Sequence, residues 1–271
     1  MTTNPDSDKR TVDAAEWRRK SRRKFLTAGA LGALGLLGGT WVVTRPEEQG
    51  VAWPLRAMYR FNEKVFRGAY SNNALGESPK APPVGTAPRV NGDVGLPAEV
   101  DYDTWRLAVT TRPEGKRGDP ATLVTYEQLE AMPQTSTTTV FRCIEGWSQV
   151  IAYKGVRFSD FLAATGAGTR DGKPWMPTTP FANLYPYVGM ETPDGEYYVG
   201  LDMESLLHPK TVLALEMNGE AMSVDNGAPL RLIVPVKYGI KNLKCIGRIF
   251  FSESRPRDYW AEDGYDWYAA L

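Results

Sequence analysis

The chain has 271 residues, of which 42% are hydrophobic and 24% charged, values that are ordinary for a globular protein with a substantial core. The chain has 32 basic residues (Lys and Arg) and 32 acidic residues (Asp and Glu), so its net charge is zero and no nucleic-acid partner is expected. The chain has one histidine, His208, and two cysteines, Cys143 and Cys245. A histidine-based zinc site is therefore excluded, and any metal must be held mostly by groups other than imidazole.

The N-terminal segment combines basic charge with an apolar run. Residues 21–26 read Ser-Arg-Arg-Lys-Phe-Leu, and residues 25–43 contain no charge. This pattern resembles a twin-arginine export signal, which implies export of the folded protein to the periplasm or another extracytoplasmic compartment. The alternative is an ordinary signal anchor. No Ala-x-Ala cleavage site follows, and nineteen residues approach the length of a membrane span, so residues 1–45 are interpreted as an export signal or an uncleaved N-terminal anchor.

A connecting region follows at residues 46–99. Apolar residues recur at nearly helical spacing over 53–66, which predicts a helix. Prolines then cluster at 78–88 and favour an extended linker. We therefore interpret residues 46–99 as a wrapping segment with a Pro-rich linker, followed by the main domain at residues 100–271.

The main domain alternates short strands with short helices. Thr125 and Gln128 form a capping box that starts a helix ending before Pro133, and a second helix at 158–164 ends at Gly166. Strands are expected at 105–109, 137–142, 211–217 (followed by a tight Asn-Gly turn at 218–219), 230–234 and 246–251. This succession predicts an α+β fold.

The first candidate site is the segment Phe-Arg-Cys-Ile-Glu-Gly-Trp-Ser at 141–148, where Cys143 directly follows a strand. Such a position exposes a side chain to a cleft, and Arg142 with nearby amides would lower the thiol pKa. A thiolate suits a soft or thiophilic metal. Two alternatives are a buried free cysteine and a disulfide between Cys143 and Cys245.

The second candidate site is the segment 225–244, in which a glycine turn leads into a strand and then a basic loop. Arg231 offers a bidentate fork, and Lys237, Lys241 and Lys244 offer point charges, so the segment is suited to cradle a phosphate. The alternative is a solvated basic loop.

Together the two segments carry a family resemblance. Arg-Cys-Ile-Glu-Gly-Trp-Ser, followed about eighty residues later by Asn-Gly-Ala-Pro-Leu-Arg-Leu-Ile-Val-Pro-Val-Lys-Tyr-Gly-Ile-Lys-Asn-Leu-Lys, resembles the sulfite oxidase family of molybdenum enzymes, and within it the periplasmic protein-methionine-sulfoxide reductases. The resemblance covers residues 100–255 and the leader. It implies a sulfite oxidase-type molybdopterin-binding fold of strand-rich mixed sheets with short helices, here expected without the C-terminal immunoglobulin-like domain.

The resemblance also assigns roles to residues of this chain. One molybdenum-molybdopterin cofactor is implied per chain, with the thiolate of Cys143 on the metal. The residues implied to hold the cofactor are Cys143, Asn62, Thr192, Asn226, Arg231, Asn242, Leu243 and Lys244. Tyr238 is expected to donate a hydrogen bond near the reacting centre. Cys245 is expected to be structural, and His208 to end a helix.

The activity implied by the resemblance is two-electron oxygen-atom transfer, in the direction of reducing S-oxides such as methionine sulfoxide, free or in proteins. A membrane-bound electron-transfer partner, such as a haem protein, would supply the electrons. One alternative is the oxidation of sulfite or a related small sulfur compound. A third hypothesis, from another class, is a noncatalytic exported binding module stabilised by the Cys143–Cys245 bridge.

Overall fold

The computed structural model describes residues 14–69, 76–113 and 118–271, and divides the chain into two units that meet between Met58 and Tyr59. The first unit contains helix α1 (Ala14–Val43) and a short hairpin of β1 (Glu47–Glu48) and β2 (Val51–Ala52). Helix α2 (Trp53–Ala69), predicted from its apolar spacing, begins in the first unit and continues into the second.

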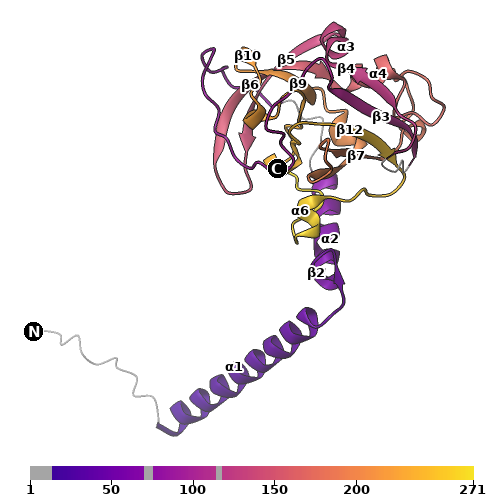
Figure 1. Cartoon of the computed structure of the whole chain (residues 1–271). Coiled ribbons are helices and arrows are strands. Elements are labelled where there is room, and N and C mark those ends of the chain that lie inside the picture. The colour runs from indigo at the N-terminus through magenta and orange to yellow at the C-terminus, as the bar shows by residue number, and fades with distance from the viewer. Residues whose placement is uncertain (1–13, 70–75, 114–117) are drawn as a thin grey trace, which may run out of the picture. The chain divides into compact units, whose positions relative to one another are not determined.

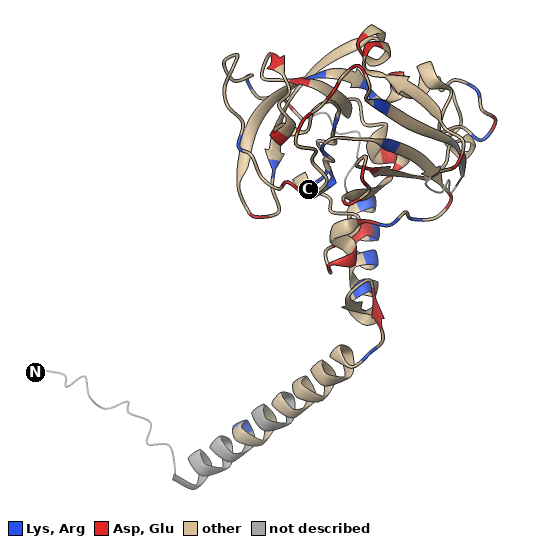
Figure 2. Cartoon of the chain, in the orientation of Figure 1, with Lys and Arg blue, Asp and Glu red and all other residues tan. Residues whose placement is uncertain are grey.

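Within α1, the segment Lys24–Val43 is long and apolar enough to cross a bilayer, with a mean hydropathy of 1.6. The sequence of this segment has no charged residue after Lys24, and the described part of its ribbon beyond Lys24 is tan (Figure 2). A signal sequence has the same length and composition, so the helix is consistent with both forms of the predicted leader.

The second unit is built on two five-stranded sheets (Figure 1). In the first, the order is β10-β9-β6-β5, with β11 also pairing with β9, and all pairs are antiparallel. In the second, the order is β4-β3-β12-β7-β8, with one parallel pair, β12 with β3. The strands are β3 (Arg106–Pro113), β4 (Thr122–Thr125), β5 (Gln134–Arg142), β6 (Ser148–Arg157), β7 (Tyr187–Glu191), β8 (Tyr198–Asp202), β9 (Val212–Met217), β10 (Glu220–Ala221), β11 (Arg231–Ile233) and β12 (Arg248–Ser252).

Short helices and 3-10 turns connect these strands. They are α3 (Tyr126–Ala131), α4 (Phe158–Thr165), α5 (Met203–Leu206), α6 (Tyr259–Glu262), η1 (Phe181–Asn183), η2 (Val224–Asn226) and η3 (Gly239–Lys241). The α+β class and the five predicted strands are confirmed. The capping box of Thr125 and Gln128 and the left-handed cap at Gly166 are also present as predicted. His208 follows α5, with its amide donating to Ser205 O at 3.3 Å.

A continuous apolar core joins the two sheets. Fully buried side chains from β3, α4, β9 and β12 meet in it, including Leu107, Phe158, Phe161, Leu213 and Phe251. Each such side chain contributes about 1.5–3 kcal/mol of burial free energy. This core fixes the positions of the strand ends, where the candidate site described below lies.

The Pro-rich segment at 76–105 has neither helix nor strand, as its prolines predict, but it is fixed to the first sheet. The Asn218 side chain donates to Thr86 O at 2.7 Å, and the amide of Arg89 donates to the Gln149 side chain at 2.8 Å. The segment therefore wraps the domain in a defined path.

Candidate active site

Cys143 lies in the turn that joins β5 to β6. Its amide donates to Trp147 O at 2.9 Å, and the amide of Gly146 donates back to Cys143 O at 3.1 Å. Gly146 has a φ of 89°, a left-handed conformation that suits glycine. The strands on either side pair in register up to Arg142 opposite Ser148, so the thiol is held at a fixed point where the sheet ends.

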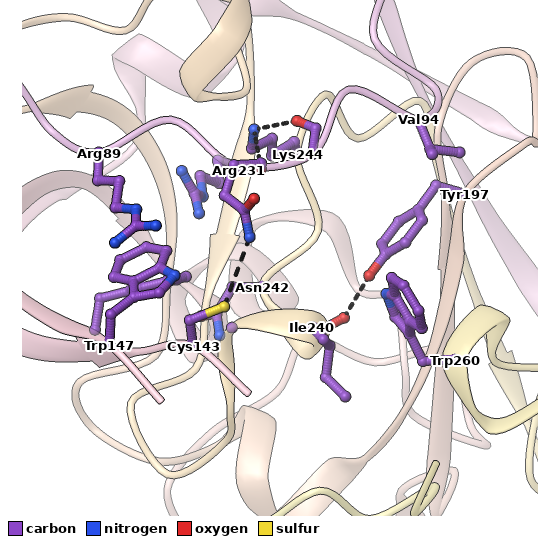
Figure 3. A pocket seen from close by; sticks show the side chains of 14 residues that line it. Arg89, Val94, Cys143, Trp147, Tyr197, Arg231, Ile240, Asn242, Lys244 and Trp260 are labelled. Atoms are coloured by element: carbon purple, nitrogen blue, oxygen red, sulfur yellow. Dashed lines mark hydrogen bonds between the residues drawn. The ribbon is translucent and has the colours of Figure 1, made fainter. Parts of the chain in front are cut away.

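The Cys143 thiol faces a pocket (Figure 3). The walls come from the β5–β6 turn, the Pro-rich segment, β11, the η3 loop and α6. The lining residues are Arg89, Asn91, Gly92, Val94, Phe141, Cys143, Trp147, Tyr197, Arg231, Gly239, Ile240, Asn242, Lys244 and Trp260.

Asn91 and Glu145 fix the surroundings of the thiol. The Asn91 amide nitrogen lies 3.6 Å from Cys143 Sγ and donates to Glu145 Oε2 at 3.2 Å. The Trp147 indole donates to the same carboxylate oxygen at 3.0 Å. Glu145 therefore ties the Pro-rich segment to the cysteine turn and orients one aromatic wall of the pocket.

Arg231 brings a buried positive charge to the pocket. Its Nη1 donates to Asn226 O at 2.8 Å, and its guanidinium lies 5.3 Å from the centre of the Phe141 ring. Burial lowers the pKa of Arg231. Its Nε is buried and has no hydrogen-bond partner among the residues that the structure describes. A buried guanidinium with an unused donor is suited to receive an anion.

Lys244 is the second cation of the pocket. Its Nζ donates to Asn91 O, Gly92 O and Asp225 O at 2.9, 2.8 and 2.6 Å. Burial, with a further contribution from the positive charge of Arg231, lowers the pKa of Lys244 to about 8. An anion bound between the two cations would relieve their repulsion.

The opposite wall is aromatic. The Tyr197 hydroxyl donates to Ile240 O at 2.8 Å, and burial raises its pKa, so the phenol stays protonated at neutral pH. Trp260 lies beside it on α6 (Figure 3). The aromatic C-terminal segment packs on the body through the buried side chains of Trp267 and Tyr268, and its Trp260 forms part of the pocket.

Lys237 and Lys241 do not line the pocket, contrary to the prediction that they help to cradle a phosphate. Lys241 Nζ forms an ion pair with Asp258 at 2.5 Å, and Lys237 Nζ forms one with Asp202 at 3.0 Å. Both lysines are almost fully buried, and burial lowers the pKa of Lys237 to about 7. A buried cation needs a buried carboxylate partner to compensate its charge. The two ion pairs therefore fix the η3 loop on the side away from the pocket.

Several other predicted residues converge on the pocket. Cys143, Arg231, Asn242 and Lys244 all line it. Asn226 approaches it through the backbone oxygen that accepts from Arg231. These residues come from the two segments singled out in the sequence, which lie far apart along the chain.

Two further predicted residues lie just behind the pocket wall. Leu243 is fully buried in the core between two lining residues. Thr192 is fully buried against the Pro-rich segment, since a Cβ added at Gly95 would lie 2.6 Å from Thr192 Oγ1. Both support the wall and neither faces the cavity.

Two predicted residues lie elsewhere. Asn62 is exposed on α2, and the asparagine beside the thiol is Asn91. Tyr238 is half-buried, outside the lining residues, and the phenol at the pocket is that of Tyr197. Asn91 follows the prolines in a segment that resembles a spacer, and Tyr197 stands in no motif, so neither carried a local signal.

Whether Cys143 and Cys245 form a disulfide or are free thiols distinguishes the noncatalytic binding module from the metal-binding hypotheses. Cys143 and Cys245 are both buried free thiols, so the Cys143–Cys245 bridge is wrong. Burial raises the pKa of Cys245 to about 11, which fits a structural role. Among the described residues, no group of three or more His, Cys, Asp or Glu side chains could hold a metal. A metal at Cys143 would therefore take one protein ligand and draw the others from a cofactor, as the resemblance implies.

Comparison with known proteins agrees with this geometry. Residues 93–260 match the family described as the oxidoreductase molybdopterin binding domain. A protein of Azospira oryzae, named as the protein-methionine-sulfoxide reductase subunit YedZ1, is 33% identical over 92% of this chain and 87% of its own length.

Two proteins named as the protein-methionine-sulfoxide reductase catalytic subunit MsrP are also similar. The one from Ralstonia nicotianae is 28% identical over 92% of this chain and 74% of its own length. The one from Xanthomonas campestris is 33% identical over 58% of this chain and 47% of its own length, so the match spans about half of that relative.

Proposed function

The chain belongs to the oxidoreductase molybdopterin binding domain family, and from this premise we propose that it is an exported enzyme that reduces S-oxides such as methionine sulfoxide. The observation that carries the proposal is the free thiol of Cys143, held on a turn at a pocket that also contains Arg231 and Lys244. The names of the relatives support the choice of substrate. The family makes the chain a molybdenum-dependent oxidoreductase.

The lining residues fit a molybdopterin. Cys143 would bind the metal as a soft anionic ligand. Arg231 would donate to the phosphate through its unused buried Nε. Lys244, whose Nζ already donates to three backbone oxygens, would offset the phosphate charge as a nearby cation. Asn242 fixes this side of the pocket, since its side-chain oxygen accepts from the amide of Val234 at 2.7 Å.

When bound, the cofactor supplies the electron pair and exchanges the oxygen atom; the overall reaction converts a sulfoxide, two electrons and two protons into a sulfide and water. The chain's own residues bind and orient the substrate. Trp147 and Trp260 offer apolar faces to the methyl-thioether part of a substrate, and the Arg89 guanidinium, 4.6 Å from the Trp147 ring centre, offers donors to the S-oxide oxygen.

The competing enzymatic hypothesis is the oxidation of sulfite. A small dianion needs several free cationic donors, whereas the lining combines two tryptophans and a tyrosine with three cations, two of which are assigned to the phosphate. The aromatic wall favours a thioether-bearing substrate.

One comparison of activities tests the proposal. Protein purified from a host that makes molybdopterin should contain molybdenum near one atom per chain and should reduce methionine sulfoxide with a reduced viologen dye. Protein from a host lacking molybdopterin should do neither. Sulfite oxidation with an artificial electron acceptor, in the absence of any sulfoxide reduction, would overturn the assignment of substrate.

The leader supports a location outside the cytoplasm. We propose that the twin-arginine pattern of residues 21–26 directs export of the folded, cofactor-loaded protein, and that a membrane-bound electron-transfer protein, such as a haem protein, reduces it. Replacing Arg22 and Arg23 with lysine should hold the cofactor-loaded protein in the cytoplasm. Unchanged export of that variant would contradict the twin-arginine route.

A further inference from the structure

The part of helix α2 that belongs to the second unit buries charged side chains and exposes apolar ones. Glu63 is only 6% exposed and forms ion pairs with Arg255 at 2.5 Å and with Arg67 at 2.9 Å. Arg67 also pairs with Glu204 at 2.8 Å and lies 4.4 Å from the centre of the Tyr268 ring. Charged side chains therefore hold this helix on the protein, where an amphipathic helix of a globular protein places apolar ones.

The outer side of the same helix is apolar. Phe61 is 58% exposed, Val65 51% and Phe66 47%. Phe61 and Val65 are four residues apart and so lie on one side of the helix. Leu55 and Met58, exposed by 43% and 53%, extend this apolar stripe toward the start of the helix. Because these side chains are exposed to water, their transfer into an apolar environment would be favourable.

The charges at the outer side of α2 are positive. Blue segments recur along its ribbon (Figure 2), and its only acid, Glu63, is buried. Arg60 and Lys64 are exposed and, being four residues apart, lie together on the side next to the apolar stripe. Trp53, which begins the helix, is 43% exposed. An apolar stripe bordered by cations and an aromatic residue is typical of a helix that lies in a membrane interface.

The chain itself leads from a candidate membrane span to α2. The span Lys24–Val43 ends nine residues (44–52) before Trp53, and nine residues reach at most about 30 Å. A chain anchored by this span therefore starts α2 close to the membrane surface.

We propose that α2 lies in the interface of a lipid bilayer, with Phe61 and Val65 among the acyl chains and Arg60 and Lys64 at the phosphate headgroups. This goes beyond the proposed function, because it sets the catalytic unit at the membrane surface from which electrons would arrive. The ion pairs of Glu63 and Arg67 then serve as the attachment of that unit to the membrane-bound helix. Lipid is favoured over a partner protein because the apolar stripe follows directly on the span and is bordered by cations that match anionic headgroups.

The test measures the depth of α2 in vesicles that contain lipid alone. Full-length holoenzyme with Phe61→Cys or Val65→Cys, labelled with an environment-sensitive dye, is reconstituted in phosphatidylethanolamine and phosphatidylglycerol vesicles that carry a lipid-linked quencher. The matched control is Leu123→Cys on β4, which is 59% exposed. Labelling of the wild type, whose two cysteines are buried, gives the background.

We expect the dye at positions 61 and 65 to be quenched several-fold more than the dye at position 123, with emission shifted to the blue. Quenching at 61 and 65 equal to that at 123 would overturn the proposal. Protection from a soluble quencher only in native membranes, and not in pure lipid, would also overturn it and identify a protein as the occupant. Sulfoxide reductase activity with a dye donor is measured on the same samples, so failure of the proposed function is seen separately.

Discussion

The substitution Arg231→Met distinguishes two effects of this residue: its effect on the stability of the cofactor-free protein and its effect on cofactor binding. In the cofactor-free protein the guanidinium is buried, its pKa is lowered by burial, and its Nε has no partner among the described residues. Methionine keeps an unbranched stem of similar length. It loses one hydrogen bond, to Asn226 O, worth about 1.5–3 kcal/mol, but removes a desolvation penalty of several kcal/mol. We therefore expect the cofactor-free variant to be more stable than the wild type by about 1 kcal/mol or more.

The same substitution should weaken cofactor binding strongly. Two charge-assisted hydrogen bonds from Arg231 to a phosphate are worth about 3–6 kcal/mol, which corresponds to a loss of affinity of about 10²- to 10⁴-fold. Arg231→Lys keeps the positive charge but loses the bidentate guanidinium, so its cofactor affinity should lie between those of the wild type and Arg231→Met.

Urea unfolding of protein from a host without molybdopterin measures the stability of the cofactor-free protein. The molybdenum and pterin content of protein from a host that makes molybdopterin measures cofactor binding. Stability and cofactor content should change in opposite directions in Arg231→Met. A cofactor-free variant less stable than the wild type, with unchanged cofactor content, would refute the assignment of Arg231 as a phosphate ligand.

Four further predictions concern residues that line or support the pocket. Glu145→Gln weakens the acceptor that holds Asn91, so kcat/KM should fall by about fivefold while the free energy of unfolding changes by less than about 1 kcal/mol; equal values of kcat/KM would contradict that positioning role. The pKa of Lys244 is lowered from 10.5 to about 8, so the unfolded chain binds more protons between these pH values. The stability of the cofactor-free protein, followed by its urea midpoint, should therefore rise with pH across that window, and it should rise less in Lys244→Met. The same slope of stability against pH in both proteins would contradict a lowered pKa of Lys244. Cofactor retention should instead fall above about pH 8, because the phosphate needs the protonated amine. Gly227→Ala should destabilise by about 1–3 kcal/mol and lower molybdenum content, since φ is 112° and the new Cβ would lie 2.9 Å from Lys244 Cβ; a stable, fully loaded variant would argue against this packing.

The sequence predicted the elements whose signals are local. The capping box at Thr125, the left-handed cap at Gly166 and the Asn-Gly turn after β9 each depend on a few neighbouring residues, and each is present. Strand β6 was not predicted, although it joins β5 to β9, because its pairing is set by partners distant in the chain.

Cys143 and Arg231, each predicted from a sequence motif, line the same pocket. The placement of two lysines was mispredicted, because burial determines where their side chains lie. Lys237 and Lys241 have the charge of phosphate ligands, but buried carboxylates from other strands and loops turn them away from the pocket. Asn91 reaches the thiol only because the Pro-rich segment wraps back over the cysteine turn, a path that no local pattern specifies.

If the Cys143 sulfur bonds the metal, X-ray absorption at the molybdenum edge of Cys143→Ser should detect the loss of that bond. The serine variant keeps the turn, whose hydrogen bonds involve only backbone atoms. We expect the variant to show one sulfur neighbour fewer around molybdenum than the wild type and to lose methionine sulfoxide reduction. An unchanged spectrum together with unchanged turnover would show that the Cys143 sulfur does not bond the metal.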